Sequence, residues 1–305
     1  MLDMISANEF ITFLLEQQYQ FKVLGTREVS CCICSSLGDL KDNCITWVKK
    51  WNENNKNLIS SAEVENLVIV CPETDFDDMQ GKGCFICTEE PKLVFFEIID
   101  HFFCVDVNDS RIAETARVYT DSIGENCSIG DYSTISKDTV IGNNVSIGSN
   151  VVTVGKVIIG DGCKIQSGTV IGEAGYGYYT LPNGHNKQVP HVGGVVLKHH
   201  VEVGSNTCID RGTIGDTIVG AYSKIDNLVH IAHNVQIGED CMVIAGAVLC
   251  GSCKLEDKSY IAPGAIIRNQ ITVARDTVVG MQTLITKDTQ AGSIMMGVPG
   301  KRKDN

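Results

Sequence analysis

Positive charge is scarce in the first third of this sequence, and the scarcity limits the partners that the protein can bind. Residues 1–110 hold 8 Lys and Arg against 19 Asp and Glu, a balance of −11, whereas the whole chain of 305 residues carries −12. Nucleic-acid binding requires a basic face that neutralises phosphates. We therefore expect no nucleic-acid partner.

Long apolar runs are absent as well. No stretch of about 18 apolar residues, the length of a membrane-spanning helix, occurs in the sequence. The N-terminal segment MLDMISANEF is acidic where a secretion signal is basic. These two features predict a protein with no membrane span that stays in the cytoplasm.

The 14 cysteines lack a pairing pattern. Cys31–Cys34 and Cys84–Cys87 are C-x-x-C pairs, each similar to half of a zinc ribbon, but no His or acidic residue accompanies them at knuckle spacing. The segments VSCCIC and GCFIC also read as apolar strands in which Cys is a small hydrophobic residue. We expect no metal, and free thiols indicate a reducing compartment such as the cytosol.

The segment 1–108 predicts a small α/β domain. Ser6 and Glu9 form a capping box, and Phe10, Phe13 and Leu14 follow at helical spacing, so the chain up to about position 22 reads as a helix. Pro91 opens a second apolar helix, KLVFFEIIDHFF. Between the two helices lie short runs typical of strands, at 29–34, 44–48, 67–71 and 84–87.

From residue 112 the pattern changes to a period of six. An aliphatic residue returns every sixth position, followed by Gly or another small residue, as in IGENCS, IGDYST and IGNNVS. The repeat is interrupted by a loop at 173–192, slips at 215–218, and then continues without a break from 219 to 285. This period is typical of a parallel β-helix in which three hexads form one coil. We count eight coils over residues 109–305, with small core cysteines at Cys127, Cys163, Cys241 and Cys253.

The hexads resemble those of the left-handed β-helix acyltransferases. Within them, IQSGTVIGEAGYGY, the loop ending in QVPHVG, TCIDRGTIGDTIVG and IDNLVHIAHNVQIG are similar to the UDP-3-O-(3-hydroxyacyl)glucosamine N-acyltransferases of lipid A synthesis. The resemblance implies a mainly β protein: a left-handed parallel β-helix with an N-terminal α/β domain that binds a nucleotide sugar. It also implies a homotrimer with active sites between subunits.

Three features depart from that family. A second His, carried by the family in a two-residue insertion after I-A-H-N, is missing, and so are its C-terminal helices. The ending GVPGKRKDN is similar to that of coenzyme A-dependent hexapeptide enzymes. We therefore expect an N-acyltransferase that moves an acyl group from acyl-CoA to the amino group of a UDP- or dTDP-linked amino sugar for cell-surface glycan synthesis, without a permanently bound cofactor.

Three alternatives remain open. The first is the lipid A reaction itself, with 3-hydroxyacyl transfer from an acyl carrier protein to UDP-3-O-acylglucosamine. The second is a non-catalytic β-helix that serves as a scaffold. The third is a hydroxyl acceptor, which would make the reaction an O-acylation.

His233 is the candidate general base. It occupies the third position of the hexad IAHNVQ, which faces outward at a corner because Ile231 and Val235 take the interior positions. Gly251 occupies the same position one coil (three hexads) later, where its backbone N–H can approach a ligand closely. Amide formation from a thioester needs a base and a donor to the oxyanion. The resemblance assigns these two roles to His233 and Gly251.

The candidate substrate-binding residues are more scattered. Asn227 and Asn234 flank the base in the sequence and are expected to bind sugar hydroxyls or to be ordinary corner residues. Tyr176 and Tyr178, in the ejected loop, are expected to cover the acyl donor, as the corresponding loop does in the family. Trp47 is the candidate for stacking on the nucleobase, with a core position as the alternative.

Several remaining charged residues and histidines receive weaker assignments. Lys301 and Arg302 are expected to meet the phosphates of coenzyme A or to lie in a solvated tail. Asp210 and Arg211 are expected to brace a turn. The pair His230 and His233, with the spacing H-x-x-H, does not match the metal site of hexapeptide carbonic anhydrases.

Overall fold

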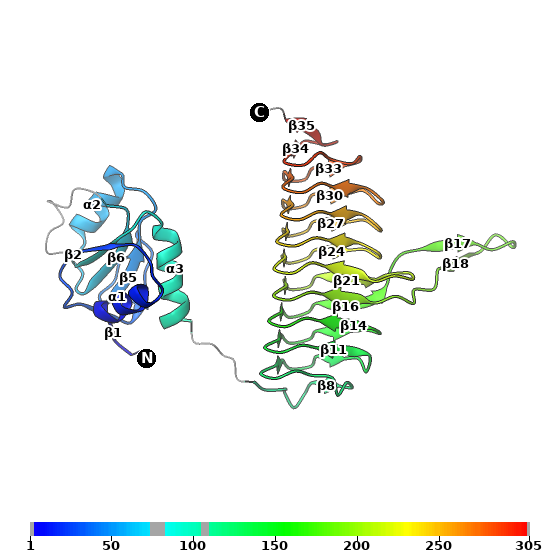
Figure 1. Ribbon diagram of the computed structural model, residues 1–305, viewed down its shortest axis with the longest axis horizontal. Helices are drawn as coiled ribbons and strands as arrows, with labels where there is room; N and C mark the ends of the chain where they lie inside the picture. The colour runs from blue at the N-terminus through cyan, green and yellow to red at the C-terminus, as the bar shows by residue number, and fades with distance from the viewer. Residues whose placement is uncertain (1–2, 74–82, 105–109, 304–305) are drawn as a thin grey trace. The chain divides into compact units, whose positions relative to one another are not determined.

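The computed structural model describes residues 3–73, 83–104 and 110–303. The chain divides into two compact units, Met1–Val107 and Asn108–Asn305 (Figure 1). The sequence predicted this division between residues 108 and 109, one residue further along the chain. None of the described helices has the length and apolarity needed to cross a membrane.

The N-terminal unit is a sheet covered by helices on both faces. Its strand order is β2-β7-β6-β5-β4, in which β2 is antiparallel to β7 and the other pairs are parallel. A two-stranded antiparallel pair, β1 and β3, lies beside it. The strands are β1 (Ile5–Ser6), β2 (Lys22–Gly25), β3 (Ser30–Cys31), β4 (Ile33–Cys34), β5 (Cys44–Trp47), β6 (Leu67–Cys71) and β7 (Cys84–Cys87). The helices are α1 (Ala7–Glu16), α2 (Glu53–Ser61) and α3 (Pro91–Phe102).

Strands β6 and β7 are buried along their whole length because both faces of the sheet pack against helices. Val68 and Val70 pack with α1 and α3, whereas Leu67 and Ile69 pack on the other side with Ile59 of α2. Side chains alternate between faces along a strand, so a doubly covered strand must be apolar at every position. The Cys84–Cys87 segment is therefore a core strand, whereas Cys34 of the other C-x-x-C pair is exposed on the edge strand β4. All 14 cysteines of the chain are free.

Three elements of this unit, β1, β2 and α2, were not predicted from the sequence, and one helix boundary was misplaced. Helix α2 was missed because only Asn55 and Ile59 among its residues are buried, which leaves no apolar stripe. Strand β2 is an edge strand and is mostly exposed. The first helix ends at Glu16 rather than near position 22, after the predicted capping box of Ser6 and Glu9, which is present.

The second unit is a prism of three parallel sheets (Figure 1). The nine-stranded sheet contains β8 (Arg117–Val118), β10 (Thr134–Ile135), β13 (Val152–Thr153), β16 (Val170–Ala174), β21 (Cys208–Arg211), β24 (His230–Ile231), β27 (Val248–Leu249), β30 (Ile266–Ile267) and β33 (Leu284–Ile285). The seven-stranded sheet contains β11 (Thr139–Ile141), β14 (Val157–Ile159), β19 (Val195–Leu197), β22 (Thr217–Val219), β25 (Gln236–Ile237), β28 (Lys254–Leu255) and β31 (Thr272–Val273).

The ten-stranded sheet forms the third face. It contains β9 (Ser128–Ile129), β12 (Ser146–Ile147), β15 (Lys164–Ile165), β20 (Glu202–Val203), β23 (Lys224–Ile225), β26 (Met242–Val243), β29 (Tyr260–Ile261), β32 (Val278–Val279), β34 (Ile294–Met296) and β35 (Lys301–Lys303). Strand β35 is antiparallel to β34, whereas the other pairs of this sheet are parallel.

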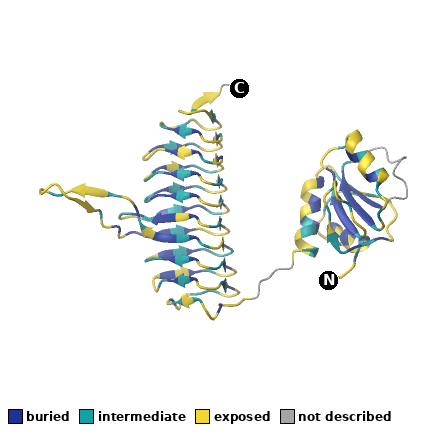
Figure 2. Ribbon diagram, turned by 180° about the vertical axis from the view of Figure 1, so that it is seen from behind, coloured by how far each residue is buried: buried dark blue, intermediate teal, exposed yellow. Residues whose placement is uncertain are grey.

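The register confirms that three hexads form one coil. Ile225 pairs with Val243, the equivalent position three hexads later. Two steps are longer: Val157 pairs with Val195 across the loop, and Val195 pairs with Thr217 across the slip. The loop is thus ejected from one coil, and a four-residue insertion is ejected from the next. The aliphatic positions fill the interior of the prism, together with the four predicted core cysteines (Figure 2).

The expected count of eight coils was too low. The nine-stranded sheet begins at β8, which pairs with β10, and the ten-stranded sheet continues to β34, which pairs with β32. The counted hexads started at position 123 and ended near position 290, so strands outside that regular stretch were not included. Irregular terminal sequence hid these strands, although their backbone bonds continue the same ladders.

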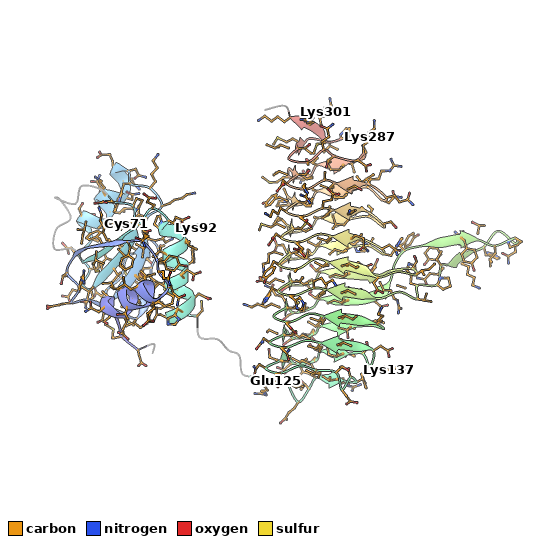
Figure 3. The ribbon with its side chains drawn as sticks, in the orientation of Figure 1. Cys71, Lys92, Glu125, Lys137, Lys287 and Lys301 are labelled. Carbon is orange, nitrogen blue, oxygen red and sulfur yellow. The ribbon has the colours of Figure 1, made fainter. Side chains whose placement is uncertain are left out.

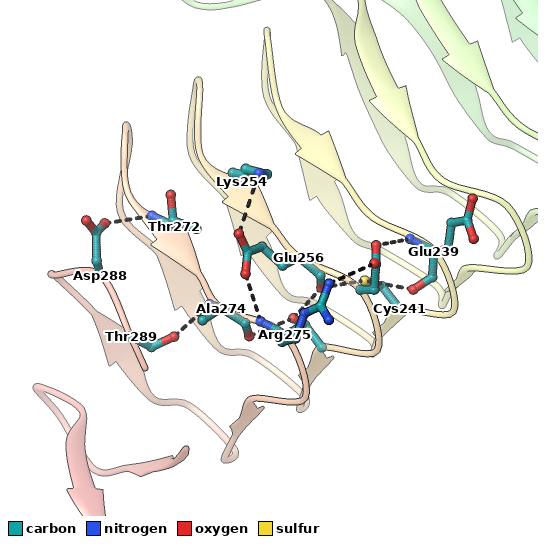
Figure 4. Close-up of polar contacts among 11 residues, drawn as sticks. Glu239, Cys241, Lys254, Glu256, Thr272, Ala274, Arg275, Asp288 and Thr289 are labelled. Carbon is teal, nitrogen blue, oxygen red and sulfur yellow. Dashed lines mark hydrogen bonds and ion pairs between the residues drawn. The ribbon is translucent and has the colours of Figure 1, made fainter. Parts of the chain in front are cut away.

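The corners of the prism have a repeating backbone conformation. In the hexads from 219 to 284 the fourth position has φ between 53° and 69°, for example 62° at Asn234 and 69° at Gly246. Asn and Gly tolerate this left-handed region better than other residues do. Side chains then bond from coil to coil along a corner, as between Glu239 N–H and Asp257 and between Arg275 and Glu256 (Figure 4).

Candidate active site

One corner of the prism differs from the other two. It lies between the nine-stranded and seven-stranded sheets, where the chain leaves β16 and projects outward as the hairpin of β17 (Tyr178–Thr180) and β18 (Asn186–Gln188) before it enters β19 (Figure 1). One coil later the four-residue insertion separates β21 from β22. His233 follows β24 at the same corner, one further coil along. Both interruptions of the repeat therefore occur beside the candidate base.

The base of the ejected loop is bound to the four-residue insertion. The N–H of Val192 donates to the backbone oxygen of Thr213 at 2.8 Å, and the N–H of Gly194 donates to Asp216 Oδ1 at 2.8 Å. Lys156 Nζ lies 2.9 Å from Asp216 Oδ2 and holds the pKa of that carboxyl below its usual value. The four-residue insertion thus holds the end of the loop in place where the chain returns to the prism.

The imidazole of His233 is held in one tautomer. Its Nδ1 lies 3.0 Å from the side-chain Oδ1 of Asn234. The same oxygen accepts the backbone N–H of Thr213 at 3.2 Å and the Thr213 hydroxyl at 2.9 Å. Because a backbone N–H can only donate, this atom must be an oxygen, and His233 must donate to it from Nδ1. In the neutral ring Nε2 therefore carries the lone pair and is available to accept a proton.

The half-buried ring of His233 lies between two glycines. A Cβ atom added to Gly175 would lie 2.8 Å from the Cβ and Cδ2 of His233. One added to Gly251 would lie 2.7 Å from its Cε1 and 2.8 Å from its Nε2. The Gly251 N–H forms no hydrogen bond within the residues that the structure describes. The structure thus brings together His233, Asn234 and Gly251, with an unused N–H donor close to the basic nitrogen.

Besides the two glycines, the ring of His233 contacts a second imidazole. The ring of His191, from the returning end of the ejected loop, is in edge-to-face contact with it, with 5.3 Å between the ring centroids. His191 is buried and was not selected from the sequence. Nothing in the pattern around QVPHVG indicated that this His would lie beside I-A-H-N, because the two segments are far apart in the sequence and meet only through the coil register.

Asp210 is a functional candidate for which the sequence predicted only a role in bracing a turn. It is 9% exposed, and its Oδ2 lies 3.8 Å from Nε2 of His230. Burial raises the pKa of its carboxyl, while the nearby His230, His233 and His191 oppose that rise. An anionic Asp210 stabilises positive charge on these rings. The structure places Asp210 among three histidines rather than only at a turn. The sequence feature that could have indicated this role is an acidic residue at the end of an aliphatic strand.

Asn227 lies at a different corner from His233. It follows β23, between the ten-stranded and nine-stranded sheets, and its side-chain oxygen accepts the N–H of Ser205 at 2.7 Å. One hexad separates Asn227 from His233, which is one full side of the prism. The structure therefore does not bring Asn227 to the candidate base, although the two are close in sequence.

The tyrosines of the loop lie on the projecting hairpin. Tyr176 is 88% exposed, and its ring centroid lies 4.9 Å from that of Tyr178. Within the part of the chain described, no core cluster covers either ring. Lys301 belongs to β35 at the C-terminal end of the prism (Figure 3). Arg302, in the same strand, contacts Gln290. They lie on the ten-stranded sheet, several strands beyond the coil that carries His233.

Trp47 lies in the N-terminal unit, at the end of β5. Its indole stacks on Phe95 at 6.0 Å between ring centroids and lines a cavity of about 720 Å³. Lys49 and Lys50 are at the cavity wall. The buried Thr46 hydroxyl at the same wall has no hydrogen-bond partner among the described residues. No group of three metal-binding side chains occurs among these residues either.

The comparisons with known proteins agree with this architecture. A family model described as bacterial transferase hexapeptide (six repeats) matches residues 122–155 and 138–173. Residues 122–173 of this chain thus carry the hexapeptide repeat that this family model describes. The structure of an acyltransferase acting on UDP-N-acetylglucosamine from Bacteroides fragilis matches it with a TM-score of 0.58, 24% identity, and coverage of 63% of this chain and 74% of that one. The corresponding Campylobacter jejuni structure has a TM-score of 0.57, 21% identity and the same coverage. The predicted fold, a left-handed parallel β-helix, is confirmed.

Relatives in sequence carry a more specific name. The UDP-3-O-acylglucosamine N-acyltransferase of Fusobacterium nucleatum is 37% identical over 208 residues, which cover 62% of this chain and 61% of that relative. The enzyme of the same name from a Caulobacter species is 38% identical over 148 residues, covering 48% and 43%. This chain thus spans less than two thirds of the length of these relatives. Their names support the lipid A alternative better than the expected acyl-CoA reaction on another sugar.

Proposed function

We propose that this protein transfers an acyl group from a thioester to the amino group of UDP-3-O-acylglucosamine. The observation that carries the proposal is the fixed tautomer of His233, whose Nε2 is available as a base beside the unused N–H of Gly251. The names of the relatives supply the acceptor. Location in the cytoplasm, where UDP sugars are made, is part of the proposal.

The geometry around His233 accounts for each step of the transfer. His233 Nε2 accepts a proton from the amine as its nitrogen bonds to the thioester carbonyl carbon. The Gly251 N–H donates to the oxygen that becomes negative in the tetrahedral intermediate. When the carbon–sulfur bond breaks, the imidazolium returns the proton to the leaving thiolate. Asp210 stabilises the imidazolium between these two steps.

The N-terminal cavity fits the nucleotide part of such an acceptor. Trp47 at the cavity wall is an aromatic surface on which a base can stack, and Lys49 and Lys50 supply positive charge suited to a diphosphate. The unpartnered hydroxyl of Thr46 offers a hydrogen bond. Quenching of tryptophan fluorescence by UMP, lost in Trp47→Leu, is the expected result; equal quenching in the variant would contradict the assignment.

We also propose that the protein is a homotrimer. Part of each outward column on the two sheets that flank the His233 corner is apolar: Val140, Ile158, Val196 and Ile218 on one sheet, and Val248, Ile266 and Leu284 on the other. Apolar columns of this kind on a soluble prism indicate a covered surface. Light scattering should give three times the mass of one chain, and Ile218→Lys should lower that mass; a monomeric wild-type protein would contradict the proposal.

A direct assay tests the reaction. Purified protein is incubated with UDP-3-O-acylglucosamine and either a 3-hydroxyacyl carrier protein or the matching acyl-CoA, and the amide product is measured by mass spectrometry. Parallel reactions contain a dTDP-linked amino sugar and a hydroxyl analogue of the acceptor. We expect product with the UDP-linked amine. Product only with the dTDP sugar or the hydroxyl analogue would replace this function with another, and no product from any pair would favour a scaffold.

A further inference from the structure

His191 has an unpartnered nitrogen. Its Nδ1 lies 2.7 Å from the backbone oxygen of Val189. A carbonyl oxygen can only accept, so Nδ1 carries the proton, and Nε2 of the neutral ring carries a lone pair. The side chain is buried, with only 8% of the residue exposed, and Nε2 has no hydrogen-bond partner within the described part of the chain. Buried polar atoms without partners are rare in folded proteins and indicate a missing donor.

The position of His191 is fixed by both the loop and the prism. The adjacent Val192 N–H bonds to Thr213, and Thr213 donates twice to the Asn234 oxygen that also holds His233. One hydrogen-bonded chain therefore connects the backbone next to His191 with the ring of the base. The two rings are in edge-to-face contact, with 5.3 Å between their centroids, so His191 directly adjoins the ring of the base.

Asp210 of β21 interacts electrostatically with groups from other segments. They are His191, His230 and His233, which oppose the rise of its pKa, and Glu173 of β16, which adds to that rise. The carboxylates are acceptors when ionised and offer no proton to His191 Nε2. The described residues thus offer no donor to this nitrogen, and a bound molecule can supply one.

We propose that His191 Nε2 accepts a hydrogen bond from the amino group of the acceptor sugar. The inference rests on the proposed function. A primary amine has two N–H groups and one lone pair; one N–H faces His233 Nε2, the second faces His191 Nε2, and the lone pair is left for the thioester carbon. A hydroxyl group has only one hydrogen and leaves one of the two imidazoles unpartnered. His191 is thus a positioning residue that favours an amine over a hydroxyl acceptor.

His191 exchanges no proton in this scheme. The carbon–nitrogen bond forms as the amine proton passes to His233 Nε2, and the carbon–sulfur bond breaks as that proton passes to the thiolate. His191 is neutral before and after, and supplies only the hydrogen bond. Its loss should therefore change the binding and orientation of the acceptor without changing the binding of the thioester.

Two substitutions test the inference. His191→Phe keeps the volume of the ring and removes both nitrogens, and His191→Gln restores a side chain that can accept a hydrogen bond. His185→Phe, in the exposed hairpin of the same loop, is the matched control. Initial rates are measured against the acceptor and the thioester separately. The hydroxyl analogue is added as a competitive inhibitor.

For His191→Phe we expect kcat/KM for the amine acceptor to fall about tenfold, the usual loss for one hydrogen bond. The KM for the thioester should stay within about twofold of the wild-type value. The preference for the amine over the hydroxyl analogue should fall by the same factor of about ten. His191→Gln should recover part of the lost kcat/KM. An unchanged acceptor KM and preference in an active His191→Phe enzyme would overturn the inference. A lower melting temperature with no change in preference would also overturn it. Wild-type protein that forms no amide would instead remove the proposed function and this inference with it.

Discussion

The three corners of the prism use the third hexad position in two different ways. At the corner of Asn227, the third-position side chain accepts the N–H of Ser205 in the preceding coil at 2.7 Å. At the corner shown in Figure 4, Asp257 accepts the N–H of Glu239 at 3.0 Å in the same manner. At the third corner, His233 bonds instead to its own neighbour, Asn234, and the next coil presents Gly251 with no side chain.

The difference separates a structural role from a chemical one. A polar side chain at the third position usually satisfies a corner N–H that would otherwise lack a partner. His233 and Gly251 break this ladder, so the site corner keeps a basic nitrogen and an N–H donor unused by the fold.

The largest expected effect comes from His233→Ala. Loss of the general base should lower turnover by at least ~100-fold, because positioned acid–base catalysis contributes that much or more. His199→Ala is the matched control, since His199 also occupies the third position of its hexad but at another corner, where it is exposed. Rates of amide formation measure both. Equal activity of the two variants would show that the His233 corner has no chemical role that the other corners lack.

Gly251→Ala should have the next largest effect. The new Cβ would lie 2.8 Å from His233 Nε2 and force the ring away from the oxyanion position. We expect kcat to fall about 10- to 100-fold, the range observed when positioning or an oxyanion donor is disturbed. Gly215→Ala, at the same corner but with open space around the added Cβ, should leave kcat unchanged. A normal rate in Gly251→Ala would contradict the proposal that the substrate approaches the backbone of Gly251 closely.

Asp210→Asn should separate stability from activity. Burial raises the pKa of this carboxyl above 3.8 in the folded protein, so the folded state binds the proton more tightly than the unfolded state does. The stability that this group contributes is therefore present at low pH and is lost as pH rises from about 3.8 through the raised pKa.

The uncharged amide of the Asp210→Asn variant removes that loss, so its melting temperature at pH 7 should rise. Turnover should fall about 10-fold, equal to about 1.4 kcal/mol of transition-state stabilisation, because the anion no longer faces the imidazolium. Thermal unfolding between pH 4 and 8 and the rate at pH 7 measure the two effects. A variant that is both less stable and fully active would show that Asp210 only braces the turn.

The smallest effect on activity is expected for Asn227→Ala. Removing the side-chain oxygen leaves the Ser205 N–H without its partner, which should lower the free energy of unfolding by about 1 kcal/mol. Because Asn227 lies at another corner, the rate of amide formation should change less than about twofold. Denaturant unfolding and the rate assay measure these two quantities. A large loss of activity would restore the substrate-binding role expected from the sequence.

Much of the fold was predictable because the interior of the prism constrains one residue in six. Ile231 and Val235 are fully buried, as their hexad positions predict, and the loop and the slip account for the two longer steps between paired strands. Helix α2 was not predictable, because a helix that buries so few of its residues has no periodic signal. The nine-stranded face was undercounted because β8 lies before the first regular hexads.

The candidate site was predictable only in part. His233 was selected from its outward position in IAHNVQ and from the family resemblance, and Gly251 from its place one coil of three hexads later. His191 and the carboxylate of Asp210 were missed because the sequence does not show where an ejected loop returns, and the hydrogen bond between Val192 and Thr213 decides that. Asn227 was expected beside the base because sequence distance was taken for spatial distance, although one hexad spans a whole side of the prism.

The sequence by itself determined the prism, since burying an aliphatic side chain at every sixth position is compatible with only that arrangement of strands. It also determined which corner carries an imidazole. Only the tertiary structure decided the tautomer of that imidazole and the histidine and carboxylate that surround it, because these depend on hydrogen bonds between segments that the coil brings together from distant parts of the chain.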